Sequence, residues 1–530
     1  MSFIIKSRSK RRRLGLDEPL RHGSHKKPVT RRDFLAQGFL TGAATVVAPS
    51  ILGTLLNARS AAAAGTLSPD INGLKDVCGI TRGADKIPFI CFDLAGGANI
   101  AGSNVLVGKK GGQLDFLTTQ GYSKLGLPGD MLPNNATTNF INTEFGLAFH
   151  SDSAFLRGML ARTSVTTRGK VNGAVIPARS ENDTGNNPHN PMYGIARAGA
   201  RGELLTLIGS QNSESGGNSM APATLMDPAN RPTKVDRASD VTGLVDTGEV
   251  ATILDPEDTV KVLETMARIS KSKIGLNVSS GYDENGTVST GLASADDIEL
   301  RKRMLCGYVK TADTVNTFGT PGELDPAQDP EITSILGADF GGDREFEKTA
   351  AIMKLVVPGY AGAGTISSGG FDYHTGDRSA GEERDFRIGQ CMGACLEYAA
   401  RRGKPLMLYV FSDGSVSSNG MVDSSAEGRG KGVWTSDNQQ TAASFFLVYN
   451  PIGRPTLMSP TSQQLGYFRP DGDVETASSP AANNVNLLVQ TVLLNYMALH
   501  GETDDFIGKF GSALGPRSAL DGLVAFQPIV

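Results

Sequence analysis

The sequence predicts an α/β protein with a mostly parallel central sheet flanked by helices. Two short apolar runs, Pro88–Leu94 and Pro405–Phe411, end abruptly in polar turns, as buried strands do. A helical segment closed by Gly403 precedes the second run, so strand, turn and helix alternate as they do in βαβ units. With 64 glycines among 530 residues, above the average usage of about 7%, the chain should also be rich in loops.

The expected strands are short and are bounded by turn-forming residues. The strand at 88–94 leads into Ala95-Gly96-Gly97, and the one near Ile366 leads into the polar turn Ser368–His374. Taken in chain order, we expect strands at 88–94, at 164–167, ending near 366–368, at 405–411 and at 444–449.

The expected helices repeat apolar residues at a period near 3.6. Val260, Leu263 and Met266 illustrate the pattern, which is typical of an amphipathic helix. The stretch from 211 to 236 is rich in Ser, Gly, Asn and Pro, and we expect a loop there. The loop and the helices that follow predict an insertion at about 211–355. The expected helices are 153–162, 257–274, 295–317, 331–336, 344–355, 384–402 and 484–499.

The segment Thr30–Leu35 contains two consecutive arginines followed by a bulky apolar pair, as in twin-arginine export signals. Residues 1–32 carry 11 Lys and Arg residues, a mild apolar run covers 34–56, and Ala61–Ala64 offers Ala-x-Ala cleavage sites. We therefore expect a signal peptide at 1–64 and an α/β domain at 65–530. The alternatives are an N-terminal membrane anchor and a basic arm that binds nucleic acid.

The charge of the chain changes after the signal. Subtracting the 12 basic and 3 acidic residues of 1–64 from the totals of 51 and 55 leaves 39 basic and 52 acidic residues, a net charge of −13. An acidic protein repels phosphate backbones, so we expect no nucleic-acid partner. No second long apolar run follows, so we expect no membrane span after cleavage and a periplasmic or secreted protein. The expected partner is the twin-arginine translocase, and the oligomeric state stays open.

The five cysteines, an odd number, do not form a dense disulfide framework. Cys391 and Cys395 lie four residues apart on an expected helix and so share a face. We expect both to be buried.

Three expected strands carry polar side chains at or just beyond their carboxyl ends, where open α/β sheets bind ligands. Asp93 closes the first, Asp372 and His374 follow the second, and Asp413 follows the third. The Asp-x-His spacing places both side chains on one side of an extended segment, and carboxylate and imidazole ligands suit Zn²⁺, Mn²⁺ or similar divalent ions. The alternative is that these residues only shape the turns after the strands, because Asp and Asn side chains form hydrogen bonds with the neighbouring backbone there.

These motifs resemble, in order and spacing over about residues 80–510, the twin-arginine-exported bacterial proteins of the domain of unknown function 1501 family. Gly370–His374 is similar to the family's Gly-Trp-Asp-Thr-His, and Ser412-Asp413 to its Ser-Glu. Leu94–Asn99, Pro188–Asn190 and Ser436–Asn438 correspond more loosely to its other motifs. Three residues depart from the family pattern: Asn99 replaces Asp, Asn438 replaces His, and Asp413 replaces Glu.

The resemblance implies an alkaline-phosphatase-like fold and a metal-dependent hydrolase of phosphate or sulfate esters. It implies Asp93, Asp372, His374 and Asp413 as ligands of a divalent metal (Zn, Mn, Mg or Ca). His189 would be a further ligand or an acid–base group, and Ser103 would be the nucleophile. The alternative function is a non-catalytic periplasmic or cell-surface scaffold with a degenerate metal site.

We predict that replacing Arg31 and Arg32 together by lysine leaves full-length precursor in the cytoplasm. The translocase reads the guanidinium pair through a receptor, so keeping the charge does not rescue export. Cell fractionation followed by immunoblotting measures this. Normal appearance of the double variant in the periplasm would contradict the assignment.

Overall fold

The computed structural model describes residues 67–75, 77, 78, 80, 86–133, 139–180, 187–244, 254, 256–274, 295–318, 321–376 and 378–530. All of them belong to the compact unit Thr66–Val530. The expected signal peptide at 1–64 lies outside the described residues.

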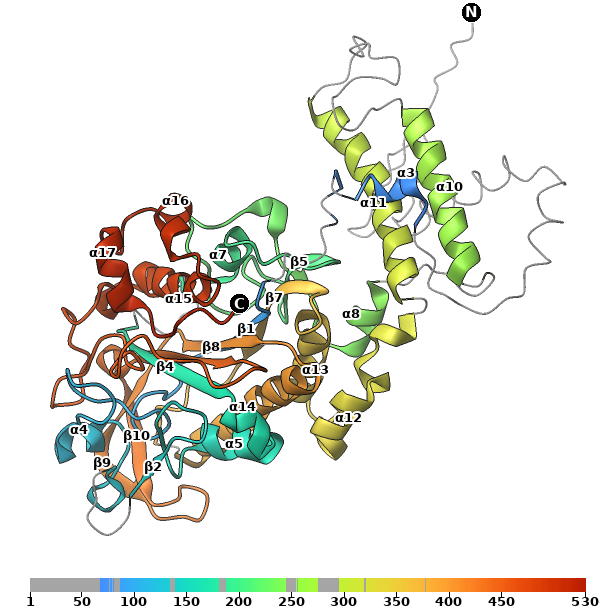
Figure 1. Cartoon of the computed structure of the whole chain (residues 1–530). Coiled ribbons are helices and arrows are strands. Elements are labelled where there is room, and N and C mark those ends of the chain that lie inside the picture. The colour runs from blue at the N-terminus through green and yellow to red at the C-terminus, as the bar shows by residue number, and fades with distance from the viewer. Residues whose placement is uncertain are drawn as a thin grey trace, which may run out of the picture. The chain divides into compact units, whose positions relative to one another are not determined.

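A seven-stranded, mostly parallel sheet forms the centre of this unit, as the sequence predicts (Figure 1). The strands β8, β1, β7, β5 and β6 run parallel to one another, whereas β11 runs antiparallel to both β8 and β4. In spatial order the strands are β4 (Val171–Pro177), β11 (Ala443–Tyr449), β8 (Leu406–Ser412), β1 (Phe89–Leu94), β7 (Ala361–Ser368), β5 (Leu205–Gly209) and β6 (Thr233–Lys234).

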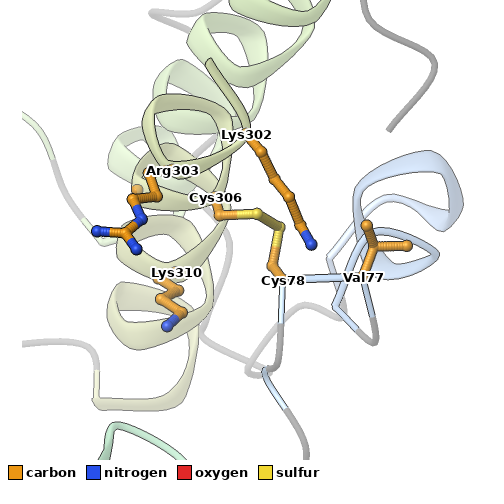
Figure 2. A pocket seen from close by; sticks show the side chains of 7 residues that line it. Val77, Cys78, Lys302, Arg303, Cys306 and Lys310 are labelled. Carbon is orange, nitrogen blue, oxygen red and sulfur yellow. A yellow bond between two sulfur atoms is a disulfide. The ribbon is translucent and has the colours of Figure 1, made fainter. Parts of the chain in front are cut away.

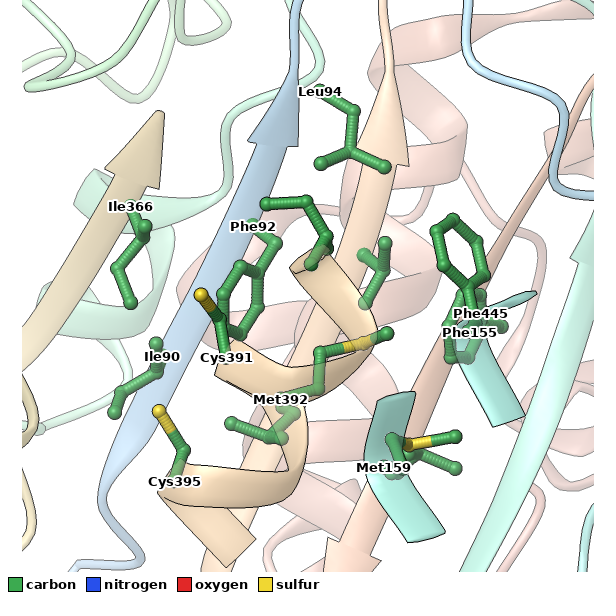
Figure 3. Close-up of a cluster of buried hydrophobic side chains, with 14 of the residues drawn as sticks. Ile90, Phe92, Leu94, Phe155, Met159, Ile366, Cys391, Met392, Cys395 and Phe445 are labelled. Atoms are coloured by element: carbon green, nitrogen blue, oxygen red, sulfur yellow. The ribbon is translucent and has the colours of Figure 1, made fainter. Parts of the chain in front are cut away.

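Helices cover both faces of the sheet, because alternate residues of each strand point to opposite sides. The alternating residues of β1 belong to different cores: Ile90, Phe92 and Leu94 pack in one, and Phe89 and Cys91 pack in the other. The first core is closed by α5 (Ala154–Arg162), α13 (Arg344–Val356) and α14 (Arg378–Arg401), as Figure 3 shows for part of it. The second is closed by α7 (Met192–Arg197) and α15 (Val485–Leu499) (Figure 1).

Close packing of α5 on α14 depends on two glycines that face each other. A Cβ on Gly158 would lie 2.2 Å from the Phe386 carbonyl oxygen, and one on Gly389 would lie 2.4 Å from that of Phe155. The two helices can pack this closely only because both residues are glycines and carry no Cβ. Cys391 and Cys395 of α14 are fully buried against the sheet, which confirms the expectation for them (Figure 3).

The expected strand at 164–167 is wrong. Residues Val165–Gly169 form the short helix α6, because the Ser164 side chain accepts a hydrogen bond from the Thr167 amide and caps the helix. The strand of this region, β4, starts immediately afterwards at Val171. Capping therefore outweighs the β-propensity of Val165 and the threonines.

The remaining elements are short or lie at the periphery. A two-stranded hairpin, β9 (Val416–Asp423) with β10 (Lys431–Asp437), follows β8. A second small sheet pairs β2 (Ile141–Asn142) with β3 (Phe149–His150). The other α-helices are α3 (Pro69–Asn72), α4 (Thr119–Lys124), α8 (Ala238–Gly243), α10 (Pro256–Ile274), α11 (Ala295–Phe318), α12 (Pro330–Leu336), α16 (Phe506–Phe510) and α17 (Arg517–Leu520).

The region expected as an insertion has two parts. Helices α12 and α13 pack on α14 and belong to the layer that covers the sheet. Helices α10 and α11 pack on each other, and with residues 67–80 they build a third hydrophobic cluster that shares no described residue with the two sheet cores. Among the described residues, no helix is both long enough and apolar enough to cross a membrane.

A disulfide between Cys78 and Cys306 joins this third cluster across 228 residues of sequence. Figure 2 shows it between α11 and the segment that carries Val77, beside a surface pocket of about 380 Å³ that Lys302, Arg303 and Lys310 also line. The sequence did not indicate this pair, because its two cysteines lie far apart in the chain and belong to no motif. Cys91, Cys391 and Cys395 are free thiols, all buried.

We predict that replacing Cys78 and Cys306 together by serine loosens the α10–α11 pair selectively. The bond closes a long loop, so its loss should lower the stability of this cluster by about 2–4 kcal/mol. Hydrogen exchange should rise in α10 and α11 and stay unchanged in β1 and β8. Reduced wild-type protein should behave in the same way, and equal protection in variant and oxidised wild type would contradict the prediction.

Candidate metal centre

Three neighbouring parallel strands end level with one another. Leu94 at the end of β1 pairs with Ser368 of β7 on one side and with Ser412 of β8 on the other. Side chains that follow these residues therefore gather at one edge of the sheet. The edge holds two groups of acidic residues, one buried and one exposed.

The buried group is the pair Asp93 and Asp413, both with no exposed surface. Asp93 accepts hydrogen bonds from the Ser219 amide (2.7 Å) and hydroxyl (2.9 Å). Asp413 accepts from the Gly96 amide (2.8 Å) and from the Asn218 side chain (3.1 Å). Burial raises the pKa of Asp93 to about 7, the Asp413 charge adds to the shift, and the Ser219 hydrogen bonds oppose it.

A glycine-rich segment closes over this pair. A Cβ on Gly217 would lie 2.5 Å from an Asp93 carboxylate oxygen, so only glycine lets the backbone pass there. Asn218 and Ser219, the next two residues, then each reach one of the two carboxylates. The segment lies in the stretch 211–236 that the sequence predicts as a loop, and it keeps both aspartates away from solvent. The prediction is wrong near the end of that stretch, where Thr233–Lys234 form β6 by pairing with β5.

The exposed group consists of Asp372, His374 and Asp437, whose candidate ligand atoms all lie within 4.8 Å of one another. The His374 Nδ1 atom lies 2.5 Å from a carboxylate oxygen of Asp372 and 3.0 Å from one of Asp437. Neither contact has hydrogen-bond geometry, so Nδ1 has no hydrogen-bond partner among the described residues. The side chains are 56%, 29% and 48% exposed, so solvent reaches all three.

Local backbone structure explains why Asp372 and His374 point the same way. They alternate with Phe371 and Tyr373, which are 1% and 2% exposed and face the interior. The Phe371 amide donates to the Ala95 carbonyl oxygen (3.0 Å), which attaches this segment to the turn after β1. Asp437 comes from the end of β10, where it pairs with Val416 of β9.

The two groups meet at Gly96. Its amide donates to Asp413, and a Cβ on it would lie 2.9 Å from the Asp372 Cβ. The structure thus gathers Asp93, Asp413, Asp372 and His374 at one sheet edge. It divides them between a buried pair with its own hydrogen bonds and an exposed cluster.

The two remaining predicted residues lie outside both groups. Ser103 is fully buried, and its hydroxyl accepts from the Asn99 side chain (2.5 Å) and from Arg378 (3.0 Å). Arg378 is in turn paired with buried Glu382 (2.6 Å), so Ser103 belongs to an internal ionic network. Its role as nucleophile stays a prediction.

His189 is 2% exposed and stacks on Phe411 of β8, with ring centroids 6.0 Å apart. Neither of its ring nitrogens has a hydrogen-bond partner among the described residues. Burial lowers its pKa to about 4, so the ring is neutral near pH 7. Its role as ligand or acid–base group also stays a prediction.

Asp437 is the residue of the exposed cluster that the sequence prediction omitted from its ligands. The only signal for it was the correspondence of Ser436–Asn438 with a late motif of the resembled family. That motif directs attention to the histidine position, where this chain has Asn438. Here the Asn438 side chain instead accepts from the Gln440 amide and caps a short 3₁₀ helix.

Comparisons of the chain with family models, with curated proteins and with solved structures find no match.

We predict that Asp93→Asn gains stability relative to wild type as pH rises from about 4 to about 7. The folded protein holds the Asp93 proton up to about pH 7, whereas the ordinary pKa of an aspartate is 3.8, so ionisation in the unfolded chain lowers wild-type stability across this window. Asparagine does not ionise, so the difference should grow by about 1–4 kcal/mol. Urea unfolding in the presence of a chelator measures it, and a pH-independent difference would contradict it.

Proposed function

We propose that the protein is an exported metal-dependent hydrolase of phosphate or sulfate esters, with its metal held by Asp372, His374 and Asp437. The observation that carries the proposal is the convergence of two carboxylates on one imidazole nitrogen that has no hydrogen-bond partner among the described residues. A nitrogen so placed is well suited to accept a cation between the three groups.

The donor set fits a divalent ion. Tetrahedral Zn²⁺ with ligand distances near 2.0–2.2 Å separates its ligand atoms by about 3.3 Å. The present separations of 2.5 and 3.0 Å from Nδ1 are within small side-chain rotations of that value. Three protein ligands leave a fourth position for water or substrate, which is the pattern of catalytic rather than structural sites.

The exposure of the cluster suits a reaction on a dissolved ester. A bound divalent ion supplies a Lewis acid for the ester oxygen and lowers the pKa of a coordinated water. Asp372 and Asp437 offset the ion's charge and orient it, and His374 completes the set. Asp93 and Asp413 are buried, and their hydrogen bonds hold the Gly217–Ser219 segment in place. The proposal does not use Ser103, whose hydroxyl is enclosed.

Export and the alkaline-phosphatase-like fold are part of the same proposal. The Thr30–Leu35 signal supports export, and the Cys78–Cys306 disulfide supports it independently, because disulfides persist in oxidising compartments such as the periplasm. The mostly parallel sheet, with acidic residues beyond three carboxyl ends, is compatible with the resembled superfamily. Fold resemblance by itself does not establish a reaction.

A non-catalytic scaffold is the second candidate, and specific contacts favour it. Asn99 and Asn438 replace an acid and a histidine of the resembled family, and both have structural roles in this chain. The Asn99 amide group donates to Ser103, and Asn438 caps a helix. A protein that had lost its reaction would show such replacements.

We predict that His374→Ala removes bound metal and abolishes the rise in melting temperature on adding Zn²⁺ or Mn²⁺. Metal binds only the folded state, so stabilisation follows occupancy. Metal analysis of protein purified from the periplasm and thermal unfolding measure this, together with hydrolysis of generic phosphate and sulfate esters.

Two controls separate the site from general damage. His150→Ala removes a buried histidine whose ring contacts the Met131 carbonyl oxygen, and Asp471→Ala removes an exposed carboxylate; neither should change metal content. Wild-type protein that binds metal without hydrolysing esters would favour the scaffold. Metal-free wild type whose melting temperature ignores both ions would overturn the metal site.

A further inference from the structure

The hydroxyl group of Tyr373 is buried and forms two hydrogen bonds. Tyr373 lies between Asp372 and His374, two residues of the proposed metal site. The oxygen accepts a hydrogen bond from the Asn99 amide (2.8 Å), and the hydroxyl donates to the Asp385 carboxylate (3.3 Å). The side chain is 2% exposed.

The acceptor of this hydroxyl is itself held from several sides. Asp385, on α14, accepts from the Asn104 side chain (2.7 Å), which also donates to the Asn99 carbonyl oxygen (2.9 Å). The Asn104 side-chain oxygen accepts from Ser153, the cap of α5. Tyr373 is therefore fastened to a network that links α14, α5 and the chain after β1.

The segment is fixed at two further points. Phe371 bonds the turn after β1, and the Gly376 amide donates to the Trp434 carbonyl oxygen of β10 (2.7 Å). Asp437 lies three residues beyond Trp434 on the same strand. Tyr373 lies between these two points, so its hydroxyl opposes rotation of the segment that would turn Asp372 and His374 away from Asp437.

We propose that Tyr373 is a positioning residue for the metal cluster, acting through its hydroxyl bonds to Asn99 and Asp385 rather than by touching the ion. The inference rests on the proposed metal site. Groups that orient metal ligands from behind typically change affinity 10- to 100-fold when they are removed.

The test is Tyr373→Phe in the full mature chain, titrated with Zn²⁺ by calorimetry. This change keeps the ring and removes only the hydroxyl, and we expect Zn²⁺ affinity to fall roughly tenfold. The matched control is Tyr398→Phe, which also removes a buried tyrosine hydroxyl that contacts a carboxylate, Asp329 (3.0 Å), away from the cluster. It should leave Zn²⁺ affinity unchanged.

A second readout separates positioning from general destabilisation. The visible spectrum of Co²⁺-loaded protein reports ligand geometry, and it should change in Tyr373→Phe but not in Tyr398→Phe. Asp385→Asn changes the carboxyl group that accepts from Tyr373 into an amide while keeping Tyr373, and it should weaken Zn²⁺ binding in the same direction by a smaller factor. This variant also tests the inference if Tyr373→Phe folds poorly.

The outcomes distinguish the inference from the metal site itself. Wild-type Zn²⁺ affinity in Tyr373→Phe, with binding abolished in His374→Ala, overturns the positioning role and leaves the metal site standing. Equal losses in Tyr373→Phe and Tyr398→Phe also overturn it, because the effect is then general. Absence of Zn²⁺ binding in wild type overturns the metal site, and the role of Tyr373 with it.

Discussion

The turn Ala95–Gly97 after β1 is the constraint on which the arrangement of the candidate site depends. The Ala95 carbonyl oxygen holds the segment that carries Asp372 and His374, and the Gly96 amide holds Asp413. Gly96 has φ +120°, and a Cβ there would lie 2.6 Å from the Asp372 backbone nitrogen. Both conditions exclude a side chain at this position. The turn therefore brings the segments after β7 and β8 together with that after β1.

Burial separates the acidic residues of this edge into groups with different properties. Asp93 and Asp413 point into the protein, where desolvation disfavours a second negative charge and local hydrogen bonds compensate for it in part. Asp372 and Asp437 keep contact with water, which screens their repulsion while His374 lies between them. The His374 Nδ1 atom of the exposed cluster is itself buried, but an ion from solution can reach the Asp372 and Asp437 side chains beside it. It would have to displace the Gly217–Ser219 segment to reach the buried pair.

Buried charged groups connect the elements around the site. Arg378 lies over the Trp434 ring at 4.5 Å and pairs with Glu382, which also accepts from buried Lys431 (2.8 Å). These charges are desolvated, so removing any one of them leaves the others unpaired at a cost of several kcal/mol, about 3–5. The network joins α14 to β10, the two elements that flank the segment with His374. It therefore limits how far the exposed cluster can move.

The sequence alone was sufficient for the fold class and for the longer helices of the described residues, and it indicated the sheet edge where the acidic residues gather, because these follow from local patterns. Apolar runs that end in polar turns predicted β1 and β8. The Asp-x-His spacing predicted that Asp372 and His374 lie on the same side of their segment. Contacts between residues that are distant in the chain could not be predicted from the sequence. Asp437 meets His374, Cys78 meets Cys306, and Ser219 meets Asp93 only because crossovers and hydrogen bonds bring distant segments together. Which carboxylates are buried and which are exposed was decided in the same way. An aspartate lies at or after the end of each of β1, β7 and β8, and only tertiary packing determines which of them a neighbouring segment covers.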